Sequence, residues 1–216
     1  MFNRAEYKKS SLVSLKNNWS LPCLLSIIFL TVSSFLSPTF FLNICVCGII
    51  EIAIIFVLMK IISQNSMTSF DFSHPLEKEK PSFGTFLEGI EKNCLSALLG
   101  SLWKFLWVFL WSLLFIIPGI VKWYSYSMMY FVMAENPGIS PMKAMDISKI
   151  LTNGHKSDLF IFHLSFLGWF LLSCLSCGIG LIWLYPYFQM AHTYAYYDLK
   201  KMAITQGKLT PSDFEA

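Results

Sequence analysis

The sequence has few charged residues, and this scarcity excludes most soluble proteins. Only 13% of its 216 residues are Asp, Glu, Lys or Arg, whereas a soluble domain carries about 25%. The formal net charge of +3 is too small to predict a nucleic-acid partner. Apolar residues make up 55% of the chain and aromatic residues 17%, with a mean hydropathy of +0.56. This composition predicts an integral membrane protein.

The sequence also lacks the common motifs of catalysis and cofactor binding. It contains no His-Glu-x-x-His, no Gly-x-Ser-x-Gly and no Gly-rich phosphate loop followed by Lys and Ser or Thr. Asp71, His74 and Glu77 lie close together in the sequence, but no second cluster completes a metal site. We predict no enzyme activity, no catalytic residue, no cofactor and no metal.

Six cysteines are present, and most lie inside or beside apolar stretches. Cys174 and Cys177 have a Cys-x-x-Cys spacing, which is a weak redox or zinc signal without a second pair. Packing of small, soft side chains between helices is the favoured interpretation. Disulfide bonding of Cys45, Cys47, Cys174 or Cys177 is left open, with Cys45 and Cys177 as one candidate pair.

A short pattern occurs three times in the chain. In each copy a glycine followed by isoleucine separates two long apolar stretches, and a polar or amphipathic segment ending in Asn precedes them. We predict that each copy folds as a helical hairpin with a tight break at its centre. The predicted breaks are at Gly48, at Pro118 and Gly119, and at Gly178.

The three copies predict an all-α membrane helix bundle of about six spans in a threefold repeat, as one domain over residues 1–216. Repeat 1 covers 1–62, repeat 2 covers 81–136 and repeat 3 covers 137–199, with a loop at 63–80 and a tail at 200–216. The predicted spans are 21–42, 45–62, 95–117, 120–134, 159–177 and 179–197. The predicted amphipathic segments that precede the hairpins are 1–18, 82–92 and 140–153.

The positions of Lys and Arg predict the orientation. Nearly all of them fall on the side opposite the three glycine breaks, and positive residues favour the cytoplasmic side. Both termini are then cytoplasmic, and the amphipathic helices lie along the inner membrane face. His155 and Lys156, where an amphipathic helix meets a span, are candidates for a lipid headgroup contact. A helix end with an orienting cation is the alternative for this pair.

Ionisable residues within spans are candidates for function. They are Glu51, Lys104, Lys122, His163 and His192. Glu51 and Lys122 occupy the same position after their glycines, so we predict an ion pair between them near the outer face. Lys104 is expected to extend its ammonium group toward the inner face. The two histidines are open to two readings, hydrogen-bonded core residues or pH-sensitive elements.

Several segments resemble one bacterial protein family. They are Asn3-Arg4-Ala5-Glu6 leading to Asn18-Trp19, WSLLFIIPGIVKWYSYSMMYFVMAENPGISPMKAM, NGHKSDLFIFHLSFLGW and GIGLIWLYPYFQMAHTYAYYDL. Together they resemble the domain of unknown function 975, most strongly from Trp111 to Leu199. The resemblance implies a multi-pass cytoplasmic-membrane protein, commonly in Gram-positive bacteria. It implies no agreed activity, so no catalytic residues carry over.

Two classes of function remain open at the level of the sequence. The first is a non-catalytic membrane module that interacts with lipids, acts as a scaffold or protects the membrane. The second is a small transporter or channel subunit, because internal repeats and broken spans occur in transporters. The expected partners are membrane lipids, with other membrane proteins or self-association left open. The expected location is the bacterial cytoplasmic membrane.

Overall fold

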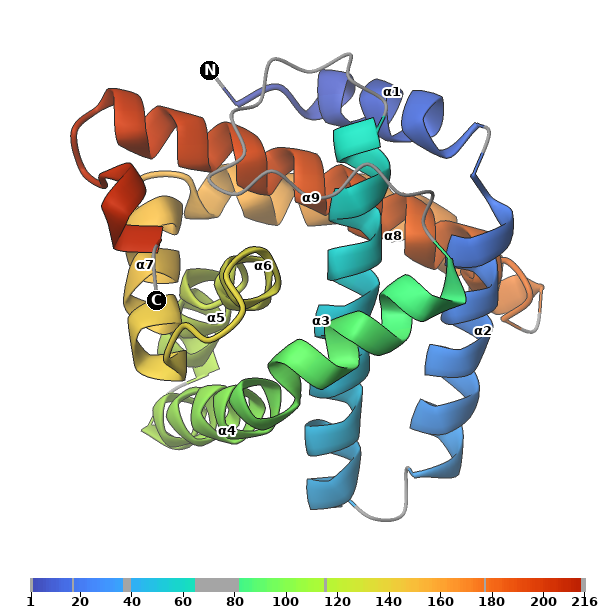
Figure 1. Cartoon of the computed structure of the whole chain (residues 1–216), viewed down its shortest axis with the longest axis horizontal. Coiled ribbons are helices and arrows are strands. Elements are labelled where there is room, and N and C mark those ends of the chain that lie inside the picture. The colour runs from blue at the N-terminus through green and yellow to red at the C-terminus, as the bar shows by residue number, and fades with distance from the viewer. Residues whose placement is uncertain are drawn as a thin grey trace.

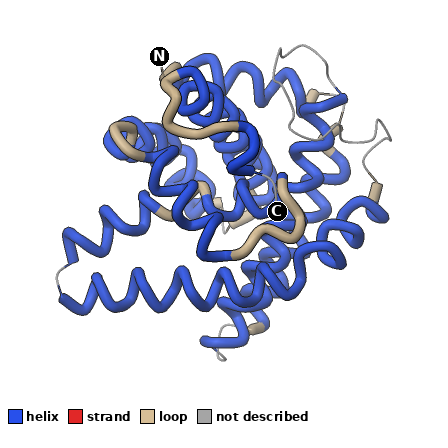
Figure 2. Tube along the Cα trace, turned by 60° about the vertical axis from the view of Figure 1, so that its left-hand side comes forward, coloured by secondary structure: helices blue, strands red, loops and turns tan. Residues whose placement is uncertain are grey.

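The computed structural model describes residues 2–16, 18–36, 40–64, 82–114, 116–176 and 178–214, and these form helices without any strand (Figure 2). The all-α class is therefore confirmed. Residues 65–80 of the predicted loop lie outside the described residues, as does Cys177. The elements are α1 (Arg4–Leu15), α2 (Ser20–Phe35), α3 (Phe40–Gln64), α4 (Phe83–Leu114), α5 (Ile116–Ser125), α6 (Met129–Glu135), α7 (Pro141–Thr152), α8 (Lys156–Leu175), α9 (Leu181–Thr205) and η1 (Pro211–Phe214).

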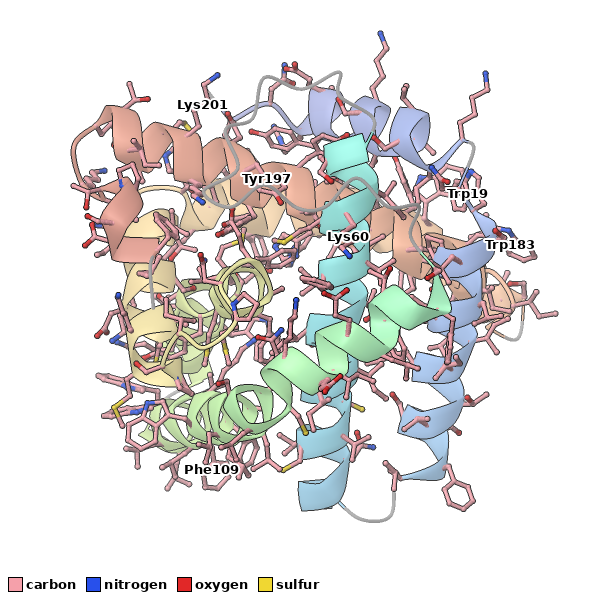
Figure 3. The ribbon with its side chains drawn as sticks, viewed as in Figure 1. Trp19, Lys60, Phe109, Trp183, Tyr197 and Lys201 are labelled. Carbon is pink, nitrogen blue, oxygen red and sulfur yellow. The ribbon has the colours of Figure 1, made fainter. Side chains whose placement is uncertain are left out.

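Helix α3 is the centre of the fold. Every side chain from residue 52 to residue 62 is buried, with α2, α4, α6 and α9 packed around the helix (Figure 1). Lys60, labelled in Figure 3, is also buried, and its ammonium group lies 3.1 Å from the Glu88 carboxylate near the start of α4. This ion pair neutralises the cation where α3 and α4 meet.

The N-terminal amphipathic segment folds as α1 and packs against α9. The Ser14 and Tyr194 hydroxyl groups lie 2.5 Å apart, and the Tyr7 hydroxyl donates a hydrogen bond to the Asp198 carboxylate. Lys8 reaches α8, where it donates to the carbonyl oxygen of Ser165 at 3.2 Å. In Figure 1, α1 and α9 run across the top of the molecule, whereas α3 runs from top to bottom. The helices therefore cross and do not form a set of parallel hairpins.

The predicted amphipathic helix 82–92 and the predicted span 95–117 are not separate elements. They form one helix, α4, of 32 residues. The Asn93 side chain donates to the carbonyl oxygen of Gly89 within the helix at 3.3 Å, and no Gly or Pro follows it to stop the helix. Asn153, by contrast, is followed by Gly154 at φ +89°, and α7 does end there, as predicted.

The prediction of one continuous helix over 120–134 is wrong. The chain leaves the helix after α5 and starts again at α6. The hydroxyl of Ser148, on α7, donates to the carbonyl oxygen of Ser125 at 2.8 Å and accepts from the amide of Met128 at 3.2 Å. A side chain inserted into the backbone hydrogen bonds in this way interrupts a helix. At about 1.5 Å per residue, α5 is too short to cross a bilayer.

Three helices among the described residues are long and apolar enough to cross a membrane. They lie at Asn43–Ser63, Phe83–Leu113 and Lys156–Leu175, within α3, α4 and α8. The pair α1 and α2, which meet at 106°, would add a fourth if the two counted as one span. Six spans and a threefold repeat are therefore not confirmed. The predicted span 179–197 lies in α9, which carries several polar residues and is not among the three.

Candidate functional site

The predicted break at Gly48 is wrong, because this glycine lies inside α3. Its role is close packing. A Cβ added at Gly48 would lie 2.7 Å from the Cβ of Ser101 on α4, a distance that real side chains do not adopt. The absence of a side chain therefore lets α3 and α4 approach each other.

The other glycines mark chain reversals in two different ways. Gly178 has φ +84°, a conformation that favours glycine, and it lies between α8 and α9. Pro118 and Gly119 lie in the first turn of α5, so the break precedes them. A Cβ on Gly119 would lie 2.9 Å from the Cα of Ser112, and a Cβ on Gly180 would lie 3.0 Å from the Cα of Ser173. The structural counterpart of Gly119 is therefore Gly180 and not Gly178.

Glu51 and Lys122 have different neighbours from those predicted. Glu51 accepts a hydrogen bond from the Gln189 amide at 3.4 Å, and its electrostatic partner is Lys104. The Lys122 ammonium lies 4.7 Å from the centre of the Trp111 ring. Among the described residues, no ion pair within 4.0 Å joins Glu51 to Lys122 or to Lys104, so the interaction with Lys104 is one of longer range.

The structure brings together four ionisable side chains and one glutamine from four helices in a group that we term the central polar cluster. It consists of Glu51 on α3, Lys104 on α4, His163 on α8, and Gln189 and His192 on α9. Lys104 interacts electrostatically with both Glu51 and His192. Sequence reasoning had placed Glu51 and Lys104 at different depths, and only the crossing of α3 over α9 and α4 brings them together.

Tyrosine rings surround the charged end of this cluster. The Lys104 ammonium lies 4.1 Å from the centre of the Tyr130 ring, which favours the cation. Gln189 also donates to the Tyr185 hydroxyl oxygen at 3.1 Å. Gln189 was not among the predicted site residues because its side chain is uncharged. Gln189 follows Tyr185 by one helical turn within an apolar stretch, and this spacing could have indicated that the two polar side chains meet.

The two histidines form the other end of the cluster. The His163 and His192 ring centres are 5.1 Å apart with the rings nearly perpendicular, and Phe188 lies beside both. Their Nε2 atoms have no hydrogen-bond partner among the described residues. His163 also lines a mostly apolar cavity of about 350 Å³ between α8 and α9, together with Tyr185. The cluster is thus connected to an opening on the α8–α9 side.

His155 and Lys156 lie where α7 ends and α8 begins. The His155 Nδ1 atom lies 3.2 Å from the Asp158 carboxylate one turn later, and its ring stacks on Phe2. A cavity beside His155 holds only about 10 Å³, too little for a phosphate group. His155 therefore serves as a local helix-start residue here, and the headgroup contact stays a prediction.

A second buried ion pair was not foreseen from the sequence. Lys200 on α9 donates to the Glu135 carboxylate at 2.8 Å, and the Tyr196 hydroxyl donates to its other oxygen at 2.5 Å. Lys200 also lies 4.2 Å from the centre of the Phe214 ring in η1. The predicted organisation places Glu135 in repeat 2 and Lys200 in the tail, so nothing linked them. No set of three residues among those described could hold a metal ion.

The comparisons with known proteins support one relationship. The model of the family described as "Protein of unknown function (DUF975)" matches residues 116–203. The resemblance predicted from the sequence is therefore confirmed for this segment, which runs from α5 to near the end of α9 and includes His163, Gln189 and His192. No curated protein and no solved structure matches the chain.

Proposed function

We propose that this protein is a non-catalytic, lipid-interacting module of the bacterial cytoplasmic membrane, with both termini on the cytoplasmic side. Its role would be that of a scaffold or a protective component. The observation that carries the proposal is the contrast between a buried central helix and two apolar helices in which few residues are buried. In the most apolar window of α3, 67% of the residues are buried, against 17% in α4 and 22% in α8.

Many of the exposed side chains of α4 and α8 are large and apolar. Such a surface would cause aggregation in water, whereas acyl chains solvate it. Phe109 on α4, labelled in Figure 3, is 54% exposed, and Trp169 on α8 is 61% exposed. The others on these two helices are Phe83, Leu87, Leu95, Leu99, Leu106, Leu110, Leu113, Phe160, Ile161, Leu164, Leu167, Phe170, Leu171, Leu172 and Leu175.

A transporter or channel subunit is the second candidate, and the central polar cluster favours it. Ionisable groups inside membrane proteins often line transport paths. Here Gln189 donates a hydrogen bond to the Glu51 carboxylate, and Lys104 lies within electrostatic range of it, so the cluster holds a cation as well as an anion. This pairing supports a structural role for Glu51 and makes the module our first choice.

Membrane insertion can be tested by cysteine accessibility on a cysteine-free background. Lys143→Cys on α7 replaces an exposed residue and should react with a membrane-impermeant thiol reagent from the cytoplasmic side. Leu172→Cys on α8 should react only after the membrane is dissolved. Labelling of Leu172→Cys in intact membranes, or release of the protein by alkaline carbonate, would contradict the proposal.

The two candidate functions can be separated by flux measurements. Full-length protein in sealed vesicles with a pH- or ion-sensitive dye should give the same leak as empty vesicles if it is a module. A protein-dependent flux that Glu51→Gln abolishes would establish the transporter instead. Lys143→Gln serves as the matched control, because that residue lies on the surface of α7.

A further inference from the structure

A cavity of about 390 Å³ lies between α4, α5 and α7. One wall is a stripe of three tryptophans, Trp103, Trp107 and Trp111, which are spaced one helical turn apart on α4. The opposite wall includes Lys122 on α5 and Lys149 on α7. We call this cavity the Trp–Lys pocket. It is separate from the central polar cluster, and the proposed function does not use it.

The charges in the Trp–Lys pocket favour an anion. Lys149 pairs with Asp146, which also lines the pocket, at 2.7 Å. Lys122 has no carboxylate within 4.0 Å among the described residues, and its ammonium group lies against the Trp111 ring. Two cations and one carboxylate leave one positive charge without a counter-ion. A cationic ligand is disfavoured, because Lys122 and Lys149 already occupy the faces of Trp111 and Tyr126.

The position of the pocket fits the interface between headgroups and acyl chains. Helix α7 is amphipathic, with Ala144 and Ile147 buried and Asp146 and Lys149 exposed. Such a pattern fits a helix at the membrane surface. Ser148 ties α7 to the end of α5, and Lys122 and the three tryptophans line one cavity with Lys149 of α7, so they lie beside this helix. Tryptophan and lysine are the residues that gather at this level of a membrane.

We infer that the Trp–Lys pocket binds the phosphate ester of an anionic phospholipid. Lys122 and Lys149 would contact the phosphate, and the tryptophan stripe would accept the adjoining part of an acyl chain. A free phosphate uses only the two lysines and leaves the aromatic wall uncovered, whereas a lipid uses both. The inference rests on the proposed membrane location and adds the class of lipid and its site.

Native mass spectrometry of the full-length protein can test this inference. The protein is mixed in detergent with equal amounts of phosphatidylglycerol and phosphatidylcholine, and the two bound populations are compared. We expect the wild type to prefer phosphatidylglycerol. Lys122→Gln should weaken that preference about fivefold, the scale of one lysine near an anionic membrane surface. Lys143→Gln, on the same helix as Lys149 but outside the pocket, should leave it unchanged, and Lys122→Arg should retain it.

Each alternative outcome has a distinct meaning. Equal binding of the two lipids by the wild type, or equal losses in Lys122→Gln and Lys143→Gln, would overturn the inference. Displacement of bound phosphatidylglycerol by millimolar inorganic phosphate would overturn the lipid assignment in favour of a free phosphate. Thermal unfolding in detergent checks that Lys122→Gln is folded, and if it is not, Lys149→Gln takes its place. Failure of lipid selectivity in a protein that passes the insertion test would reject this site alone.

Discussion

Ser125 and Ser148 are joined by a hydrogen bond that replaces a bond of a helix. The Ser148 hydroxyl donates to the Ser125 carbonyl oxygen at 2.8 Å, where a continuous helix would place the amide of Met129. That amide instead bonds to the carbonyl oxygen of Tyr126. The serine of α7 thus sets the turn between α5 and α6, and through it the position of both helices.

Ser148→Ala should destabilise the protein by about 1–3 kcal/mol, because the amide of Met128 would lose its buried acceptor. Chemical unfolding in a fixed detergent measures the effect. Ser157→Ala, at an exposed position on α8, is the control and should change the free energy of unfolding very little. Equal effects of the two substitutions would show that Ser148 does not hold the turn.

At the chain reversals near Gly119 and Gly180, one additional methyl group should destabilise the fold. Gly119→Ala and Gly180→Ala each place a Cβ against the backbone of a facing serine, so each should cost about 1–3 kcal/mol, as overpacking does. Gly168→Ala on α8 meets no atom within 4 Å and should be neutral or slightly stabilising, since alanine favours a helix over glycine. The thermal unfolding temperatures of the three variants in one detergent decide the matter, and a uniform shift would refute the close-contact account.

The buried pair of Glu135 and Lys200 should show strong coupling. Both side chains are at most 5% exposed, and removal of one partner leaves the other charged and buried. Glu135→Gln or Lys200→Met alone should therefore cost about 3–5 kcal/mol, with the double variant losing clearly less than the sum. Lys201→Met is the matched control, because the neighbouring lysine is exposed. Additive losses in unfolding experiments would contradict the pairing.

The sequence was sufficient where local chemistry determines the structure. The predicted amphipathic segment 140–153 agrees with α7, where the Ser140 hydroxyl oxygen accepts from the amide of Lys143 at the start of the helix. Asn153 followed by Gly154 marks the end of α7, because glycine readily adopts the positive φ at which a helix ends. Long apolar runs predicted α3 and α8 because a helix satisfies its own backbone groups. In each case residues within one or two turns determine the outcome.

The sequence was not sufficient where distant residues determine the structure. The turn at 126–128 depends on Ser148, which lies on another helix, and nothing near Ser125 indicates it. Gly48 resembles the other glycines in sequence but packs against Ser101 inside a helix. The central polar cluster requires the crossing of α3, α4 and α9, and a repeat pattern contains no information about crossing. The assumption of parallel hairpins therefore led to the wrong partner for Glu51.

The partner of Glu51 provides the sharpest test of the arrangement. Since a carboxylate and an ammonium are both costly inside a membrane-embedded fold unless they are paired, Glu51 and Lys104 should be energetically coupled. A double-mutant cycle of Glu51→Gln and Lys104→Met should give an interaction energy of about 1 kcal/mol or more. The cation–π contact of Lys104 with Tyr130 is lost in both arms of the cycle and therefore cancels.

The matched cycle replaces Lys104→Met with Lys122→Met. Lys122 lies against Trp111, away from any carboxylate within ion-pair distance among the described residues, so its effect and that of Glu51→Gln should simply add. Both cycles are read from unfolding in the same detergent. Coupling of Glu51 to Lys122 with none to Lys104 would restore the threefold hairpin model and reject the crossing of α3 and α4. Coupling to Lys104 alone would support a structural role for Glu51, because a carboxylate held by a lysine and a glutamine is poorly placed to load and release an ion.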